Sequence, residues 1–257
     1  MMTAASPQTP VPFIQITGLK KSFGGQKTLQ GVDLTIRHGE TLVLIGPSGE
    51  GKSVLLKHII GLMQPDAGKV ELDGVNLCCL HERQLMQVRR RMGYLFQNAA
   101  LFDSLTVSQN VAFPLKEAGI RDKAEIEARV HEALDLVELS EHKDKMPINL
   151  SGGMRKRVGI ARAIIGRPEC VLYDEPTAGL DPIVTDVIDL MILRMQKHFA
   201  VTSIVITHDM TSVFKIADRV AMLKNGVVYF DGTPEELKMS PDPEIQNFIA
   251  GRSGMKA

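Results

Sequence analysis

Short apolar runs separated by polar turns predict β-strands in the first and last parts of the chain. Residues 40–46, ETLVLIG, are almost continuously apolar, a pattern typical of a strand buried on both faces of a parallel sheet. Similar runs predict further strands at residues 13–19, 32–36, 69–74, 92–97, 170–175 and 203–208. We expect these strands to form a central sheet.

Other segments carry apolar residues at helical spacing. A helix at residues 51–63 follows the buried strand directly, and the turn residues QPDAG break it. Near the end of the chain, a hairpin is expected to turn at Asn225–Gly226, before a helix that starts at Thr233–Pro234. The other predicted helices span residues 106–119, 122–139, 152–166 and 182–199.

The order of strands, then helices, then strands predicts an α/β fold that forms one domain over residues 1–257. We expect a sheet-based core at about residues 13–97 and 167–240. A helical insertion at about 98–166 would interrupt this core, and residues 241–257 would form a C-terminal tail.

The composition limits the possible partners. Hydrophobic residues make up 44% of the chain, enough for a core, and 30 Lys+Arg residues balance 30 Asp+Glu residues. A net charge of zero provides no general attraction for nucleic acid or anionic lipid, so no nucleic-acid partner is expected. Any polyanion must be bound by a local site.

Cysteines and apolar segments bear on the location of the protein. Cys78, Cys79 and Cys170 form no C-x-x-C pair, and their odd number argues against a disulfide framework, as in a reducing cytosol. Residues 1–12 lack the basic and apolar regions of a signal peptide and are interpreted as a flexible leader. The apolar runs are shorter than the roughly 18 residues that span a bilayer, so a membrane role would require a partner.

A glycine-rich loop provides the clearest chemistry. Residues 46–53, GPSGEGKS, match the G-x-x-x-x-G-K-[ST] pattern, and they lie where a predicted strand ends and a helix begins. Its glycines allow backbone N–H groups to surround a phosphate, Lys52 can reach the β- and γ-phosphate oxygens, and the Ser53 hydroxyl suits Mg²⁺. The predicted phosphate-binding residues are Gly46, Pro47, Ser48, Gly49, Glu50, Gly51, Lys52 and Ser53.

Polar residues at the ends of three other strands complete a candidate catalytic site. Asp174 ends the strand CVLYDE, where parallel sheets gather their polar groups, and would hold Mg²⁺. Glu175 could orient and deprotonate an attacking water. His208, after SIVIT, is expected to contact the γ-phosphate, and the Gln97 amide oxygen could reach Mg²⁺ or the water.

A second possible anion site occurs a long way down the chain. In NLSGGMRKRV, Ser151, Gly152 and Gly153 begin a helix, whose free N–H groups and dipole attract anions. The basic residues Arg155–Arg157 follow at once.

Together these motifs resemble the nucleotide-binding subunit of an ABC transporter. The resemblance rests on the phosphate loop followed by FQ, LSGG, YDE, GLD and TH in that order, and it extends from about Phe13 to Leu237. It implies a P-loop NTPase fold with a RecA-like, mostly parallel sheet core, an N-terminal antiparallel β subdomain and an inserted helical subdomain. It also implies an ATPase that uses ATP and Mg²⁺.

The resemblance also explains the second anion site. In this family two subunits pack head to tail, so that Ser151, Gly152 and Gly153 of one copy would close over ATP held by the other. Asp181 in GLD would link the two sites of this homodimer. Phe23 fits the aromatic residue on which the family stacks adenine, although it could instead be a core residue.

Two residues of the loop depart from the family pattern. Glu50 replaces a small residue and should repel phosphate unless its side chain points outward. Val54 replaces a Thr of the nucleotide site, which removes at most one hydrogen bond to the α-phosphate, on the order of 1 kcal/mol.

The segments LSGGMRKRVGIARAI, GLMQPDAG, LFDSLTVSQNVAFPL and THDM further resemble the ATPases of Mla and Mce phospholipid transporters. This resemblance implies a peripheral location on the cytoplasmic face of the bacterial inner membrane. The implied partners are a membrane permease, whose coupling helices the insertion would receive, a membrane-anchored lipid-binding substrate protein and often a small STAS-domain protein.

Other interpretations are also considered. The ATPase of an importer for a polar solute, such as an amino acid, would have a similar catalytic core. A soluble ABC protein acting on ribosomes or DNA usually carries two cassettes or a coiled coil, neither of which is present here. A regulator that binds nucleotide without hydrolysis is disfavoured by the intact pair Asp174 and Glu175.

Overall fold

The computed structural model describes residues 12–252, so almost all of the expected leader and the last residues of the tail lie outside the described part. The strands are β1 (Ile14–Phe23), β2 (Gln26–Ile36), β3 (Thr41–Ile45), β4 (Ala67–Leu72), β5 (Val75–Asn76), β6 (Met92–Leu95), β7 (Cys170–Asp174), β8 (Thr202–Ile206), β9 (Arg219–Lys224) and β10 (Val227–Gly232). The α-helices are α1 (Lys52–Ile59), α2 (Glu82–Arg90), α3 (Val107–Glu117), α4 (Lys123–Leu136), α5 (Gly152–Ile164), α6 (Pro182–Phe199), α7 (Met210–Ile216), α8 (Pro234–Met239) and α9 (Pro243–Ile249).

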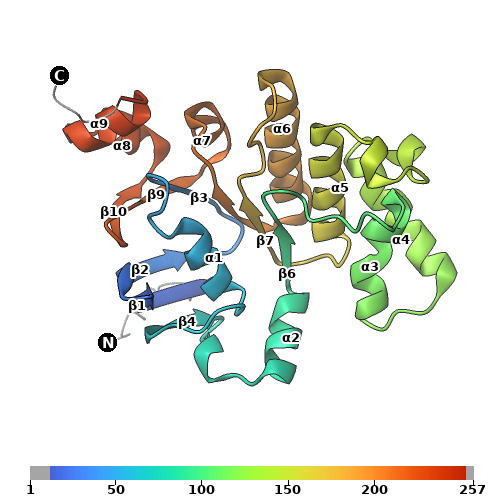
Figure 1. Ribbon diagram of the computed structural model, residues 1–257, viewed down its shortest axis with the longest axis horizontal. Helices are drawn as coiled ribbons and strands as arrows, with labels where there is room; N and C mark the ends of the chain where they lie inside the picture. The colour runs from blue at the N-terminus through green and yellow to red at the C-terminus, as the bar shows by residue number, and fades with distance from the viewer. Residues whose placement is uncertain (1–11, 253–257) are drawn as a thin grey trace, which may run out of the picture.

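The strands form two sheets, shown in Figure 1. A 4-stranded antiparallel sheet has the order β2-β1-β4-β5, and a 6-stranded sheet has the order β10-β9-β3-β8-β7-β6. In the larger sheet, the strands from β9 to β6 are parallel, and β10 pairs antiparallel with β9. The expected α/β fold, with a mostly parallel core and an N-terminal antiparallel sheet, is confirmed.

Alternation along β3 divides the core between the two faces of the large sheet. Leu42 and Leu44 pack toward α1 and the antiparallel sheet, whereas Val43 and Ile45 pack toward the helices on the other face. All four side chains are fully buried. The continuously apolar sequence of this strand is therefore explained by burial on both faces, as predicted.

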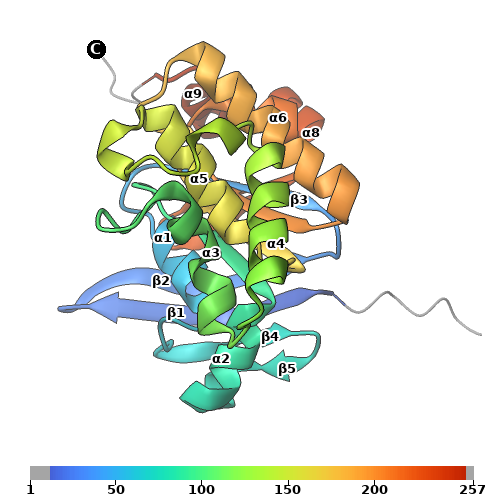
Figure 2. The ribbon, with the colours of Figure 1, turned by 90° about the vertical axis from the view of Figure 1, so that its right-hand side faces the viewer.

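The helical insertion lies beyond the β6 edge of the large sheet, where Figure 2 shows α3, α4 and α5 side by side. Helix α5 contacts both α3 and β6 and belongs to the same hydrophobic cluster as the sheet. This close contact requires glycine in the strand, because a Cβ on Gly93 would lie 2.3 Å from the Ala163 carbonyl oxygen of α5. No helix within residues 12–252 has the length and apolarity needed to cross a membrane.

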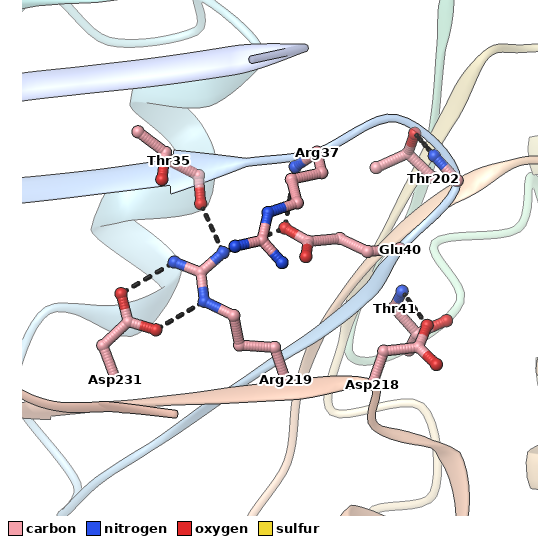
Figure 3. A network of polar contacts seen from close by, with 9 residues as sticks. Thr35, Arg37, Glu40, Thr41, Thr202, Asp218, Arg219 and Asp231 are labelled. Atoms are coloured by element: carbon pink, nitrogen blue, oxygen red, sulfur yellow. Dashed lines mark hydrogen bonds and ion pairs between the residues drawn. The ribbon is translucent and has the colours of Figure 1, made fainter. Parts of the chain in front are cut away.

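At the amino ends of the parallel strands, a polar network connects the two sheets (Figure 3). Arg219 at the start of β9 donates to both Asp231 carboxylate oxygens at 2.5 and 2.7 Å, to the Thr35 carbonyl at 2.9 Å and to Glu40 at 3.1 Å. Burial raises the pKa of Glu40. Because Arg219 joins β2, β10 and the turn before β3, it holds the β9–β10 hairpin in place.

Several elements differ from the sequence-based expectation. Helix α1 ends at Ile59 rather than Met63, because Gly61 adopts a left-handed conformation with φ of 69°. Helix α2 was not predicted, and its only buried residues are Leu85 and Val88, too few for a clear apolar stripe. Helices α7 and α9 were also missed, and α9 shows that part of the expected tail is ordered.

Replacing Gly93 with Ala should lower the free energy of unfolding by about 1–3 kcal/mol, because the new methyl group would force α5 away from β6. Gly166→Ala is the matched control, since a Cβ there meets nothing within 4 Å. Urea unfolding of both variants measures the difference. Equal stability of the two variants would show that the α5–β6 contact is not tight.

Candidate functional site

The parallel strands bring the predicted polar residues to one edge of the large sheet. The strand order β3-β8-β7-β6 places their carboxyl ends side by side. The residues that follow these strands are those of the glycine-rich loop, His208, Glu175 and Gln97, and Asp174 ends β7. The candidate site therefore lies at the edge where open α/β sheets bind ligands.

The glycines of the loop have distinct roles. Gly46 has φ of 139°, and a Cβ there would lie 2.2 Å from the Leu223 carbonyl oxygen of β9, so the loop begins in close contact with that strand. Gly49 has φ of 86° with no atom within 4 Å of its Cβ position, which leaves open space beside the backbone. Gly51 is the left-handed N-cap of α1. A Cβ would be strained or blocked at each position.

Lys52 provides the positive charge of the loop. Its Nζ donates to the carbonyl oxygens of Gly46 at 2.7 Å and Pro47 at 2.8 Å, so the ammonium lies within the curve of the backbone. Burial lowers the pKa of Lys52, while the charges of Glu175, Glu50 and Asp174 oppose this shift. The loop thus combines N–H donors with a cation surrounded by carboxylates.

The carboxylate of the unusual Glu50 contacts the β9–β10 hairpin. Its carboxylate accepts a hydrogen bond at 3.2 Å from the N–H of Gly226, in the turn between β9 and β10. The turn itself forms at Asn225–Gly226, as predicted, with both residues at positive φ. The β9–β10 hairpin therefore binds the Glu50 carboxylate and stabilises the position of the glycine-rich loop.

Ser53 and Asp174 provide a suitable magnesium site, although they are separated by 121 residues in the chain. The Ser53 hydroxyl donates to Asp174 Oδ1 at 3.0 Å, and Tyr94 OH donates to Asp174 Oδ2 at 3.3 Å. A hydroxyl and a carboxylate oxygen are ligands that Mg²⁺ prefers, usually together with waters and substrate phosphates. Tyr94, which was not predicted, orients the carboxylate, and burial followed by the charge of Asp174 raises the pKa of Tyr94.

Glu175 and His208 form a second pair. The carboxylate Oε2 of Glu175 lies 2.9 Å from His208 Nδ1; the Glu175 side chain is 15% exposed and that of His208 is 69% exposed. This oxygen is buried and has no hydrogen-bond partner of acceptable geometry, despite the short distance. Such an acceptor can receive a hydrogen bond from water or substrate. The backbone of Glu175 is left-handed, with φ of 50°.

Gln97 and Phe23 lie at the periphery. Gln97 is exposed two residues beyond β6, and the structure shows no hydrogen bond from it to Ser53 or Asp174. Phe23 ends β1 at the tip of the β1–β2 hairpin, is 45% exposed and has Lys21 Nζ 5.8 Å from its ring centroid. Phe23 is therefore not a core residue, and its ring face is available for stacking.

The second anion site is separate from this constellation. Ser151 is the exposed N-cap of α5, and its hydroxyl accepts from Met154 N–H at 3.2 Å. Gly153 allows α5 to approach α6, since a Cβ there would lie 2.5 Å from Val184. Asp181 caps α6 by accepting from the backbone N–H groups at its start. Ser151, Gly152 and Asp181 are all exposed, and the structure shows no hydrogen bond from them to the loop at residues 46–53.

Another residue that the prediction missed is Lys156, whose Nζ donates to the Glu175 carbonyl oxygen at 2.7 Å. The sequence contains a weak signal for it, because Lys156 lies in the basic run Arg155–Arg157. Its contact with Glu175 depends on how α5 packs against β6, the neighbour of β7, which the sequence pattern does not define.

Comparisons with known proteins agree with this geometry. A protein-family profile described as "ABC transporter" matches residues 29–178. The probable ribonucleotide transport ATP-binding protein mkl of Mycobacterium tuberculosis is 39% identical over 239 residues, which cover 93% of this chain and 67% of mkl. The methionine import ATP-binding protein MetN of Caulobacter vibrioides is 45% identical over 218 residues, 85% of this chain and 65% of MetN. The chain thus spans about two thirds of the length of these relatives.

Solved structures of ATP-binding cassettes are also similar. The dimeric post-hydrolysis state of the cassette MJ0796 bound to ADP and Pi has a TM-score of 0.80 at 31% identity and covers 86% of this chain and 98% of its own. The cbiO1 protein of Clostridium perfringens, part of the transporter complex cbiONQ, has a TM-score of 0.82 at 31% identity. The match covers 89% of this chain and 91% of the cbiO1 chain.

The fold and site define a P-loop ATPase with an ATP-binding cassette. The chain belongs to the ABC transporter family.

Replacing Lys52 with Met should weaken ATP binding about 10- to 100-fold, because a charge-assisted contact to phosphate from this half-buried side chain contributes about 1.5–3 kcal/mol. Calorimetric titration with ATP in the presence of Mg²⁺ measures the change. Lys57→Met, at an exposed position of the same helix, is the control and should bind as the wild type does. Similar affinities for the two variants would exclude a phosphate contact by Lys52.

Proposed function

We propose that this chain is the ATPase subunit of a phospholipid transporter of the Mla type, and that it hydrolyses ATP at the carboxyl edge of its parallel sheet. The observation that carries the catalytic part is the convergence of Lys52, the Ser53–Asp174 pair and the Glu175–His208 pair at one place. Together these groups supply a cation that can bind phosphate, a pair of oxygen ligands for a metal ion, and a general base.

Each residue has a specific task in this proposal. The N–H groups of residues 46–53 and the Lys52 ammonium bind the ATP phosphates. Ser53, Asp174 and Gln97 would hold Mg²⁺, which when bound would neutralise charge on the transferred phosphoryl group. Glu175 accepts the proton of the attacking water at its Oε2 atom, and His208 contacts the γ-phosphate from the end of β8. Phe23 stacks on the adenine, and Val54 lies where the family loop supplies a hydroxyl.

A second copy of the chain completes each site. In the proposed head-to-tail homodimer, Ser151 and the N–H groups of Gly152 and Gly153 bind the γ-phosphate of ATP held by the partner copy. Ser151 and Gly152, and Asp181 at the start of α6, are exposed and so accessible to such a partner. The similar cassette MJ0796, which is dimeric with ADP and Pi bound, supports this arrangement.

The expected permease contact corresponds to a cleft of about 780 Å³ between β6, α2 and α3, lined by residues that include Phe96, Phe102 and Phe113. Phe102 is 43% exposed and packs on Phe113, with ring centroids 4.7 Å apart. The fully buried Asn110 holds the Phe102 loop by hydrogen bonds to its backbone N–H and carbonyl groups. An ordered apolar cleft of this kind suits a short amphipathic helix of a membrane permease.

The phospholipid cargo rests on the resemblance of four segments to Mla and Mce ATPases. From the same resemblance we propose a peripheral position on the cytoplasmic face of the inner membrane. We also propose two further partners, a lipid-binding substrate protein and a STAS-domain protein. The helical region at about 98–166 would act as the subdomain that meets the permease. A second candidate, import of a polar solute, is favoured by the similarity to a protein named for methionine import.

Isolation of the full chain with its native membrane partners distinguishes the two cargoes. Extraction should recover phospholipid bound to the complex, and the addition of phospholipid vesicles should stimulate ATP hydrolysis by the complex, whereas methionine should have no effect. Stimulation by methionine without bound lipid would favour the second candidate. Either result leaves the ATPase assignment unchanged.

Replacing Glu175 with Gln should reduce the rate of ATP hydrolysis by about 100-fold or more, because the amide cannot accept the proton from water. ATP binding should persist, and size-exclusion chromatography should show an ATP-dependent dimer. Glu141→Gln, at an exposed site on the insertion, is the control with normal turnover. Undiminished hydrolysis by Glu175→Gln would remove this residue from the base role.

The shared site can be tested in the same background. Addition of Ser151→Arg to Glu175→Gln should prevent the ATP-dependent dimer, since a large side chain would fill the space for the partner's γ-phosphate. ATP binding to the monomer should remain normal. A dimer that still forms would contradict the proposed head-to-tail arrangement.

A further inference from the structure

The basic run that follows Ser151 does not form a single cationic surface. Its three side chains each donate to a backbone carbonyl oxygen: Arg155 to Leu150 at 3.1 Å, Lys156 to Glu175 at 2.7 Å and Arg157 to Val137 at 3.2 Å. The two arginines support the loop before α5 and the end of α4. Lys156 alone reaches the candidate catalytic centre.

Lys156 is an unusual lysine because it is only 6% exposed. A buried ammonium is costly unless it is hydrogen-bonded and close to negative charge. Burial lowers the pKa of Lys156, while the nearby charges of Glu175 and Asp174 raise it. The acid pair at the end of β7 therefore balances the ammonium, and the ammonium reduces the repulsion between the two carboxylates.

The carbonyl that Lys156 contacts belongs to a residue whose backbone conformation is unfavourable. Glu175 has φ of 50°, and a non-glycine residue in the left-handed region costs about 1–3 kcal/mol. Its N–H donates to Ile206 of β8 at 3.0 Å, and its carbonyl accepts from Ala178 N–H at 3.3 Å as well as from Lys156. Contacts from β8 and α5 thus hold the backbone that carries the Glu175 carboxylate.

We propose that Lys156 is a positioning residue that fixes Glu175 in the orientation needed for hydrolysis. The proposal rests on the role of Glu175 proposed above. Since Lys156 lies on α5, less than two turns from the exposed Ser151 at the helix start, it also joins the surface offered to the partner's ATP to the acid of the chain's own site. Movement of α5 is thereby transmitted to Glu175 by one hydrogen bond.

A positioning role differs from a purely structural one in its effect on kinetics. Loss of a structural lysine would reduce stability and weaken ATP binding together with turnover. Loss of a positioning lysine should reduce kcat while ATP binding remains intact, because the loop at residues 46–53 has no hydrogen bond to Lys156. The expected split between kcat and affinity provides the test.

The experiment compares full-length variants in steady-state ATP hydrolysis, ATP titration calorimetry and thermal unfolding. Lys156→Met, which removes charge and donor at similar length, should lower kcat about 10- to 100-fold, as expected for a misplaced reacting group. The dissociation constant for ATP should stay within about threefold of wild type. Lys156→Gln restores a neutral N–H donor and should recover most of the loss, to about three- to fivefold below wild type.

Arg157→Met is the matched control, because it removes the adjacent cation and a similar hydrogen bond that ends on the insertion instead of Glu175. It should retain a kcat within about twofold of wild type. In the Glu175→Gln background, Lys156→Met should cause no further loss of turnover, because the residue through which it acts is already disabled.

Three results would overturn the proposal. If Lys156→Met has the wild-type kcat while the separate variant Glu175→Gln is inactive, the positioning role of Lys156 is rejected and the role of Glu175 as the base is retained. A parallel loss of ATP affinity and kcat that Lys156→Gln does not rescue would identify a structural lysine. Full activity of Glu175→Gln would remove the proposed base and this inference with it. If Lys156→Met does not fold, a reduced kcat with normal ATP affinity in Lys156→Gln supports the proposal, and a wild-type kcat rejects it.

Discussion

The parallel register of β6, β7, β8 and β3 is the constraint on which the candidate site depends. Tyr173 lies opposite Leu95 on one side and Val205 on the other, so the ends of all these strands reach the same edge. A slip of one residue in any pair would turn its terminal polar side chain to the opposite face. The hydrogen bond between Ser53 and Asp174 depends on this register, because β8 lies between β3 and β7, the two strands that lead to these residues.

The phosphate loop depends on a second constraint, the position of the β9–β10 hairpin. The hairpin contacts the loop through the Leu223 carbonyl beside Gly46 and through the Gly226 N–H that binds Glu50. Gly226 also accepts from Gln30 N–H of β2 at 2.8 Å, and the Arg219 network fixes the other end of the hairpin. The loop is thereby coupled to the antiparallel sheet, so a substitution far from the nucleotide site can alter the conformation of the loop at residues 46–53.

Local sequence signals predicted much of this architecture. The G-x-x-x-x-G-K-S loop, the strand that ends at Asp174 and the Asn225–Gly226 turn each carry their chemistry within a few residues. Residues that act through tertiary contacts were not predicted, because Tyr94 and Lys156 gain their partners only when β6 pairs with β7 and α5 packs against β6. Helix α2 was missed for a related reason, since most of its residues are exposed and only Leu85 and Val88 are buried.

The distribution of charge explains why one chain would need a second copy. Lys52 is half-buried and Lys156 is buried, and the charges of Asp174 and Glu175 act on both, so the acids of the chain's own site offset much of the charge of its cations. An added triphosphate therefore brings negative charge that these lysines only partly offset. The N–H groups at the start of α5 carry a partial positive charge, and Ser151 and Gly152 there are exposed to solvent. Two copies in opposite orientation would bring this charge to each nucleotide, which would make ATP itself the main attraction between them.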